Sequence, residues 1–157
     1  MFNESFYEEY GKQWATPLRA SHEELCSKKK VEDWTELIPH GVEINTFIDF
    51  GCGNGVFLDL FAQKQNITGL GIDISQSMIA AARQKFPASS FIVGTVQTLR
   101  NRNLAADLVF FNDVLEHVEN PVEHLIWARS ISKFVGITIP LERTWLIAML
   151  NSLHLKQ

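Results

Sequence analysis

Short apolar runs alternate with helical stretches from about residue 46 to residue 139, and this alternation most constrains the fold. The runs predicted to be strands are 46–50, 68–72, 90–93, 107–111 and 134–139. The helices predicted between them are 54–65, 75–86 and 121–132. Strands separated by helices in this way lie parallel and are joined by right-handed crossovers. Both faces of a parallel sheet are buried, which accounts for the continuously apolar runs. The pattern predicts an α/β fold with a doubly wound, mostly parallel sheet.

The length of 157 residues favours one domain with its own hydrophobic core. Within it we expect a helical N-terminal cap at 1–41, a core at 42–140 and a short C-terminal helix at 141–157. In the cap, a helix is predicted from about Ser21 to Ile38. Ser21 is its predicted N-cap, with Glu24 three residues later in the capping-box pattern.

The charge balance argues against a nucleic-acid-binding surface. The chain has 14 Lys and Arg against 18 Asp and Glu, a net charge of −4, whereas phosphate contacts need a concentrated basic face. The one basic run, at 28–30, is flanked by acidic residues, and we interpret it as a solvated helix face.

Three further features predict a cytoplasmic protein. No apolar run approaches the roughly 18 residues of a membrane span, and the N-terminus is acidic and polar rather than a secretory signal. Cys26 and Cys52 are too few for a disulfide framework, so we expect reduced thiols.

A glycine-rich turn follows the first predicted strand. It reads Gly51-Cys52-Gly53-Asn54-Gly55 and leads directly into a helix. Glycine allows positive φ and brings backbone close to a ligand, and a helix N-terminus offers free N–H groups. The pattern indicates a site for a carboxylate, ribose or phosphate, although a tight strand-to-helix turn alone would also account for it.

An acidic residue ends the second predicted strand. Asp73 lies 22 residues after Gly51, and neighbouring parallel strands end at the same crevice. A carboxylate there accepts hydrogen bonds from both hydroxyls of a ribose. Asp73 as a helix cap is the alternative, but Ser75 already suits that role.

The type of nucleotide follows from the residues around the turn. The dinucleotide fingerprint G-x-G-x-x-G/A would require Gly or Ala at position 56, where this chain has Val56. The sequence from Asp49 to Gly55 instead reads DFGCGNG, and here it resembles the class I S-adenosylmethionine-dependent methyltransferases, in the small-molecule branch with quinone and sugar substrates. The resemblance covers about 46–140 and implies a Rossmann-like fold, S-adenosylmethionine as cofactor and S-adenosylhomocysteine as product.

The resemblance also implies roles for individual residues. The cofactor contacts that it implies come from Asp49, Gly51, Cys52, Gly53 and Gly55 at the methionine part, Asp73 at the ribose, Ile74 at the adenine ring, and Asn112 and Asp113 near the methyl donor. Thr95 stands where many relatives have the Asp that binds the adenine amino group. We expect the Thr95 hydroxyl or the Val96 N–H to take that contact.

The candidate catalytic residues lie after the fourth predicted strand. Residues 107–121 are similar to the D-x-V-x-x-x-x-V-L-E-H-V-x-x-P segment of the same branch, which implies a place at the pocket rim. His117 is the candidate base because histidine titrates near neutral pH, and Glu116 accompanies it. A capping or surface histidine and an ordinary rim acid are the alternatives. Asp113 with these two residues would also suit a divalent ion, although no further ligand is visible and we expect no metal.

The N-terminal cap has candidates of its own. The resemblance implies that Tyr7, Tyr10 and Trp14 line the acceptor pocket and that Arg19 meets the cofactor carboxylate. Packing of these aromatic residues onto the sheet is the alternative.

The chain ends earlier than the resemblance predicts. The family's sheet has seven strands, but only 17 residues follow Pro140. The fifth strand should therefore be an exposed edge, as in a shortened protein, a fragment, or a protomer of a homodimer that pairs through this edge.

The function predicted is methyl transfer from S-adenosylmethionine to a small-molecule acceptor by in-line displacement. One alternative is a cofactor-binding module of the same fold without independent catalysis. A less favoured alternative is a nicotinamide-dependent oxidoreductase.

Overall fold

A computed structural model describes residues 9, 17–100 and 102–140 of the chain. The predictions for Tyr7, Tyr10, Trp14 and the C-terminal helix at 141–157 lie outside these residues, as does the side chain of Arg19. The proposed division of the domain into cap, core and C-terminal helix therefore stays a prediction.

Five parallel strands form one sheet in the order β3-β2-β1-β4-β5. The strands are β1 (Thr46–Phe50), β2 (Thr68–Asp73), β3 (Ser90–Val93), β4 (Ala106–Asn112) and β5 (Ser132–Thr138). The helices are α2 (Pro17–Leu37), α3 (Val56–Gln65), α4 (Gln76–Lys85), α5 (Val96–Leu99) and α6 (Pro121–Ile131). This arrangement confirms the predicted doubly wound α/β fold.

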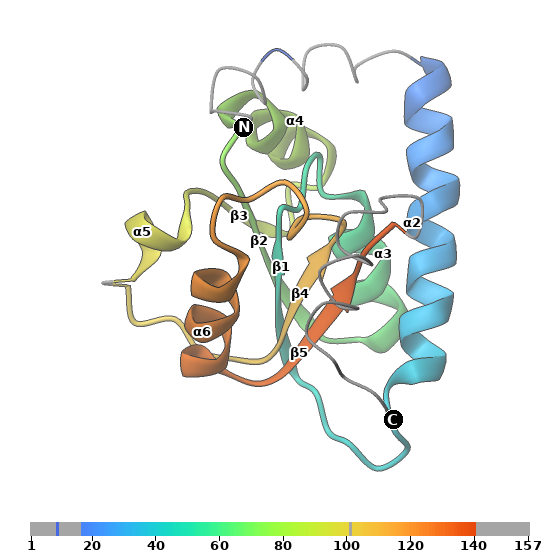
Figure 1. Cartoon of the computed structure of the whole chain (residues 1–157). Helices are drawn as coiled ribbons and strands as arrows, with labels where there is room; N and C mark the ends of the chain where they lie inside the picture. The colour runs from blue at the N-terminus through green and yellow to red at the C-terminus, as the bar shows by residue number, and fades with distance from the viewer. Residues whose placement is uncertain (1–8, 10–16, 101, 141–157) are drawn as a thin grey trace.

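The helices cover both faces of the sheet (Figure 1). One hydrophobic cluster joins the sheet to α2, α3 and α4, and a second joins it to α5 and α6. β1 lies at the centre of the order, and its last four residues are buried. The carboxyl ends of β1, β2 and β4 therefore meet at one edge of a sheet that is packed on both sides.

The helix ends were predicted with mixed success. The Ser75 hydroxyl accepts a hydrogen bond from the Met78 N–H at 3.3 Å, which confirms Ser75 as the N-cap of α4. The predicted cap at Ser21 is wrong, because α2 begins at Pro17 and Ser21 is an exposed residue inside the helix. The φ angle of proline fits the first turn of a helix, so the helix starts one turn earlier than the capping-box pattern indicated.

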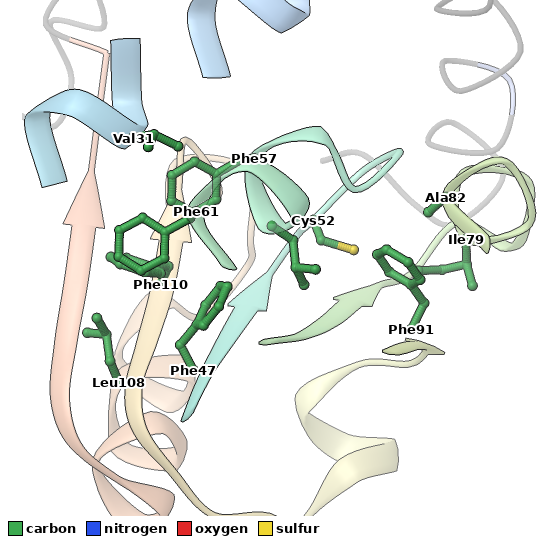
Figure 2. Close-up of a cluster of buried hydrophobic side chains, with 11 residues drawn as sticks. Val31, Phe47, Cys52, Phe57, Phe61, Ile79, Ala82, Phe91, Leu108 and Phe110 are labelled. Atoms are coloured by element: carbon green, nitrogen blue, oxygen red, sulfur yellow. The ribbon is translucent and has the colours of Figure 1, made fainter. Parts of the chain in front are cut away.

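Phe110 on β4 is the centre of the first cluster, part of which Figure 2 shows. Its side chain is fully buried, and its ring lies 4.9–5.9 Å from four other aromatic rings, those of Trp34, Phe47, Phe57 and Phe61. Most of these pairs are edge-to-face, the geometry that the aromatic quadrupole favours. The ring thus joins α2, α3, β1 and β4.

β5 is the last strand in the order of the described sheet, and two of its apolar side chains are partly exposed. Phe134 and Ile137 are 43% and 38% exposed. In the part of the chain that the structure describes, no helix is long and apolar enough to cross a membrane.

We expect Phe110→Ala to lower the free energy of unfolding by about 3–5 kcal/mol, because it removes a buried ring and leaves a cavity. Urea unfolding followed by circular dichroism measures the change. Phe134→Ala, which removes the same ring from a half-exposed position on β5, is the matched control and should cost much less. Equal losses for the two variants would contradict this account of the core.

Candidate functional site

Three polar side chains converge where the central strands end. Asp73 ends β2, Asn112 ends β4, and Asp49 is the penultimate residue of β1. In the register of the sheet, Asp49 pairs with Gly71 on β2 and with Phe110 on β4. The crevice predicted from the sequence is therefore the meeting point of these three strand ends.

The glycines of the turn differ in how closely neighbouring atoms pack against them. Gly51 and Gly55 have φ of 80° and 82°, and a Cβ there would lie 2.3 Å from Val114 and 2.7 Å from Phe91. These two positions are glycine because neighbouring side chains pack against them. At Gly53 the nearest described atoms, from Glu23 and Met78, would be 3.9 and 4.0 Å away. Gly53 also has a positive φ, of 53°, so its backbone conformation rather than a close neighbour favours glycine there.

Asp73 is oriented toward this turn. Its carboxylate accepts hydrogen bonds from the Gly53 N–H at 2.9 Å and from the Ser75 N–H at 2.8 Å. These bonds connect the glycine turn to the start of α4, so the carboxylate and the turn share one site, as the sequence predicted. Asp73 as a whole is partly exposed.

Asp49 is buried beneath the turn with 2% exposure. Its carboxylate accepts a hydrogen bond from the Asn112 amide at 3.2 Å, and the Asn112 oxygen accepts one from the Trp34 indole N–H at 2.9 Å. Since an indole only donates, the amide oxygen must face Trp34. Burial raises the pKa of Asp49 to about 7, while the Asn112 hydrogen bond and the charge of Lys30 oppose this and Asp73 adds to it.

Helix α2 brings further charged residues that the sequence reasoning missed. Glu23 accepts a hydrogen bond from the Asn54 amide at 2.6 Å, and burial raises the pKa of Glu23. Lys30 forms an ion pair with Asp113 at 2.7 Å, so the interpretation of residues 28–30 as a wholly solvated face is wrong for Lys30. Their spacing along the helix, together with Trp34, was the signal that could have found them.

Asp113 follows β4 in an unusual backbone conformation. Its φ of 57° lies in the left-handed region, which non-glycine residues adopt rarely. The Thr138 carbonyl and hydroxyl both accept from its N–H at 3.1 Å, and the hydroxyl lies 3.0 Å from its Oδ1. The end of β5 thereby fixes this residue at the site.

Glu116 lies inside the protein rather than at a rim, which corrects the sequence interpretation. The residue is 8% exposed, and neither carboxylate oxygen has a hydrogen-bond partner in the described structure. His117 Nε2 lies 3.8 Å from Glu116 Oε1, too far for a hydrogen bond. Among residues 9, 17–100 and 102–140, no three acidic, His or Cys side chains form a group that could hold a metal ion, so Asp113 does not join these two as a ligand set.

The remaining predicted cofactor residues are placed less directly. The Cys52 side chain is buried in the first cluster (Figure 2), and burial raises the pKa of its thiol. Ile74 is partly buried. The Thr95 hydroxyl accepts from the Thr98 N–H as the cap of α5, and Val96 is fully buried. Helix α5 was not predicted, and its cap already uses the hydroxyl expected to bind adenine.

The comparison with protein families decides the identity of this fold. The Methyltransferase domain family matches residues 48–137, which is more than half of the chain. The chain belongs to this family. The resemblance to class I S-adenosylmethionine-dependent methyltransferases is therefore confirmed.

Individual relatives of this methyltransferase domain cover it only in part. A trans-aconitate 2-methyltransferase from Delftia acidovorans is 38% identical over 74 residues, which is 45% of this chain and 28% of the relative. A 37.1 kDa protein from transposon TN4556 of Streptomyces fradiae is 32% identical over 103 residues, 62% of this chain and 30% of the relative. The chain thus spans less than two-fifths of the length of these relatives.

Solved structures share the fold of the domain. The plantazolicin methyltransferase BpumL, solved in complex with SAH, has a TM-score of 0.67 at 18% identity, covering 90% of this chain and 61% of BpumL. An O-methyltransferase family protein from Burkholderia thailandensis has a TM-score of 0.65 at 24% identity, covering 89% and 47%.

We expect Asp49→Asn to flatten the pH dependence of stability between about pH 4 and pH 7. The pKa of Asp49 is about 7 in the folded protein against 3.8 ordinarily, so the folded state holds a proton that the unfolded state has lost. Stability therefore falls as pH rises through this window, by about 1.4 kcal/mol per pH unit at most. Urea unfolding at several pH values measures the slope.

Asp107→Asn is the matched control, with the opposite sign. The Lys133 ammonium and the N–H groups of Asn45 and Thr46 hold the pKa of Asp107 well below its usual range. The contribution of Asp107 to the free energy of unfolding is present above about pH 4 and is lost only as the pH falls further. An Asp49→Asn variant that keeps the wild-type slope from pH 4 to pH 7 would contradict the assignment.

Proposed function

We propose that this methyltransferase domain binds S-adenosylmethionine at the glycine turn and transfers its methyl group to a small-molecule acceptor. The observation that carries the proposal is the position of Asp73, whose carboxylate is held beside the glycine turn by the backbone N–H groups of Gly53 and Ser75. A fixed carboxylate accepts hydrogen bonds from vicinal ribose hydroxyls. The family assignment supports the same cofactor.

The other proposed cofactor residues surround this pair. Asp49 and the turn at 51–55 take the methionine part. Ile74 and Val96 lie near the adenine. The Gly94 N–H donates to the Asp73 carbonyl at 2.9 Å, so the segment from Gly94 to Val96 begins beside the proposed ribose site. Since the Thr95 hydroxyl caps α5, a backbone group is the better candidate for the adenine contact. Asn112 and Asp113 border the methyl donor.

Methyl transfer from an activated donor requires few catalytic groups from the protein. When bound, S-adenosylmethionine supplies a methyl group on a positively charged sulfur that is already activated for transfer. Aligning the acceptor with that methyl accounts for much of the acceleration, and a base is needed only if the acceptor arrives protonated. The products are the methylated acceptor and S-adenosylhomocysteine.

We propose His117 as that base, taking the proton that a hydroxyl acceptor loses. The half-buried imidazole lies beside the buried Glu116 carboxylate. Glu116, 3.8 Å from the imidazole and without a hydrogen-bond partner in the described residues, is proposed as a positioning residue for His117.

The binding module without catalysis stays the second candidate. It is favoured by β5, the last strand in the order of the described sheet, whose Phe134 and Ile137 side chains are partly exposed. A cofactor that binds without turnover across acceptors would support it. The acceptor panel should include small carboxylic acids, since several relatives are named trans-aconitate 2-methyltransferases.

The proposed cellular location and binding partners of the protein rest on its cysteines and its charge. We propose a cytoplasmic protein, supported by the two cysteines, both free in the structure. The net charge of −4 supports a small-molecule acceptor over nucleic acid. We also propose that two copies can pair through the edge of β5.

The alternative of a nicotinamide-dependent oxidoreductase is opposed by Val56. This residue stands where the dinucleotide fingerprint requires Gly or Ala, and it is buried at the start of α3.

We expect Asp73→Asn to weaken S-adenosylhomocysteine binding by about 10- to 100-fold, because the charged acceptor of the ribose hydrogen bonds is lost. Isothermal titration calorimetry measures the dissociation constant. Asp59→Asn on α3, which removes a carboxylate bonded to Gln63 and Ser89, should leave it unchanged. The proposed cofactor site is wrong if the wild-type chain binds NADH and not S-adenosylhomocysteine.

We expect His117→Ala to lower methyl transfer to a hydroxyl acceptor about 100-fold, with S-adenosylhomocysteine affinity unchanged. The rate of S-adenosylhomocysteine release is measured across the acceptor panel. His40→Ala, at an exposed position after α2, is the control and should keep the wild-type rate. An unaltered rate in the His117 variant would leave this histidine structural.

A further inference from the structure

The left-handed backbone of Asp113 is not explained by helix capping. Among the described non-glycine residues, Asn66 and Asp113 have a positive φ. Asn66 is the C-cap of α3, a position where the left-handed conformation is common. Asp113 instead follows the last residue of β4 and ends no helix. The contacts that hold its φ at 57° therefore point to a separate purpose.

Thr138 contacts Asp113 through both its hydroxyl and its carbonyl. It is the last residue of β5 and pairs with Asn112 in the register of the sheet. The Asp113 N–H donates to the carbonyl and to the hydroxyl oxygen of Thr138, each at 3.1 Å. The hydroxyl in turn donates to Asp113 Oδ1 at 3.0 Å, while Lys30 contacts Oδ2. One hydroxyl thus bonds the backbone and the side chain of the left-handed residue.

The chain after Asp113 turns onto the candidate site. Val114 packs on the glycine turn, since a Cβ at Gly51 would lie 2.3 Å from its Cγ2. The Val114 carbonyl accepts a hydrogen bond from the His117 N–H at 2.9 Å, which closes a tight turn over residues 114–117. The backbone conformation of Asp113 therefore sets where this turn lies relative to the glycines.

We propose that Thr138 is a positioning residue for methyl transfer, because its hydroxyl keeps Asp113 left-handed and so places His117 at the site. The inference rests on the proposed function and adds a residue that no sequence motif marked. Aspartate tolerates the left-handed region better than most residues, but the region stays unfavourable for it. Without the hydroxyl, Asp113 can relax to other backbone conformations, and the turn at 114–117 moves with it.

A second pair of Thr and Asp provides a matched control at the other edge of the sheet. The Thr46 hydroxyl accepts a hydrogen bond from the Asp107 N–H at 3.1 Å and lies 3.3 Å from Asp107 Oδ2. Thr46 is the first residue of β1, and the first residues of parallel strands lie at the edge opposite the strand ends. Thr46→Val therefore removes the same type of contact away from the candidate site.

Two measurements on the full chain test the inference. Hydrogen–deuterium exchange followed by mass spectrometry reports on the amides of residues 113–118, and steady-state kinetics with the acceptor panel gives kcat and KM. The variants are Thr138→Val, which has the shape of threonine without the hydroxyl, Thr138→Ser, which keeps the hydroxyl, and Thr46→Val. Circular dichroism in urea shows that each variant is folded under the conditions of the assay.

We expect Thr138→Val to exchange the amides of residues 113–118 about 3- to 10-fold faster, as for the loss of one hydrogen bond. It should lower kcat about 10- to 100-fold, because a small misplacement of reacting groups is costly. The KM for S-adenosylmethionine should stay within twofold. Thr138→Ser and Thr46→Val should keep the wild-type exchange at 113–118 and the wild-type kcat.

Several results would overturn the inference. Wild-type exchange at 113–118 in Thr138→Val means that the hydroxyl does not hold this segment. A wild-type kcat in that variant makes the contact structural only. Thr138→Ser that is as slow as Thr138→Val, or an equal loss in Thr46→Val, excludes the Thr138 hydroxyl as the cause. A wild type that transfers no methyl group refutes the proposed function instead, and the exchange rates then still decide whether the hydroxyl holds the turn.

Discussion

The hydrogen-bond chain from Trp34 through Asn112 to Asp49 is the interaction on which the rest of the site depends. Its three members come from α2, the end of β4 and β1. A buried carboxylate without a donor is costly, so the Asn112 amide must point its N–H₂ at Asp49. The Trp34 indole enforces that orientation because it only donates. A shift of α2 would therefore disturb the Asn112 amide that donates to the buried acid Asp49.

Side-chain packing constrains the glycine turn from both sides. Val114 fills the space beside Gly51, and Phe91 fills the space beside Gly55. The turn is thus packed against the segment after β4 and against β3, and its N–H at Gly53 points to Asp73. Because these contacts lie within the protein, the geometry that would meet a ligand is set before any ligand arrives.

The sequence predicted what depends on local patterns and missed what depends on the orientation of a helix. The strands at 46–50 and 90–93, the Ser75 cap and the shared position of Asp73 and the turn follow from periodicity, capping and parallel topology. Lys30 was missed because it belongs to a basic run, and only the docking of α2 decides which of its lysines turns inward. Glu116 was placed at a rim because the resemblance of residues 107–121 to a family segment implied that position, and its burial depends on tertiary packing that the segment alone does not reveal.

The carboxylates of the proposed site reduce the stability of the chain when they are ionised and would suit a cationic ligand. Burial raises the pKa of Asp49 and of Glu23, so each ionised group weakens the fold. A positively charged ligand reverses this, since an opposite charge nearby favours the ionised carboxylate. Binding of such a ligand would then release a proton from Asp49 below about pH 7. By linkage, affinity rises with pH over the range in which the stability contributed by Asp49 falls.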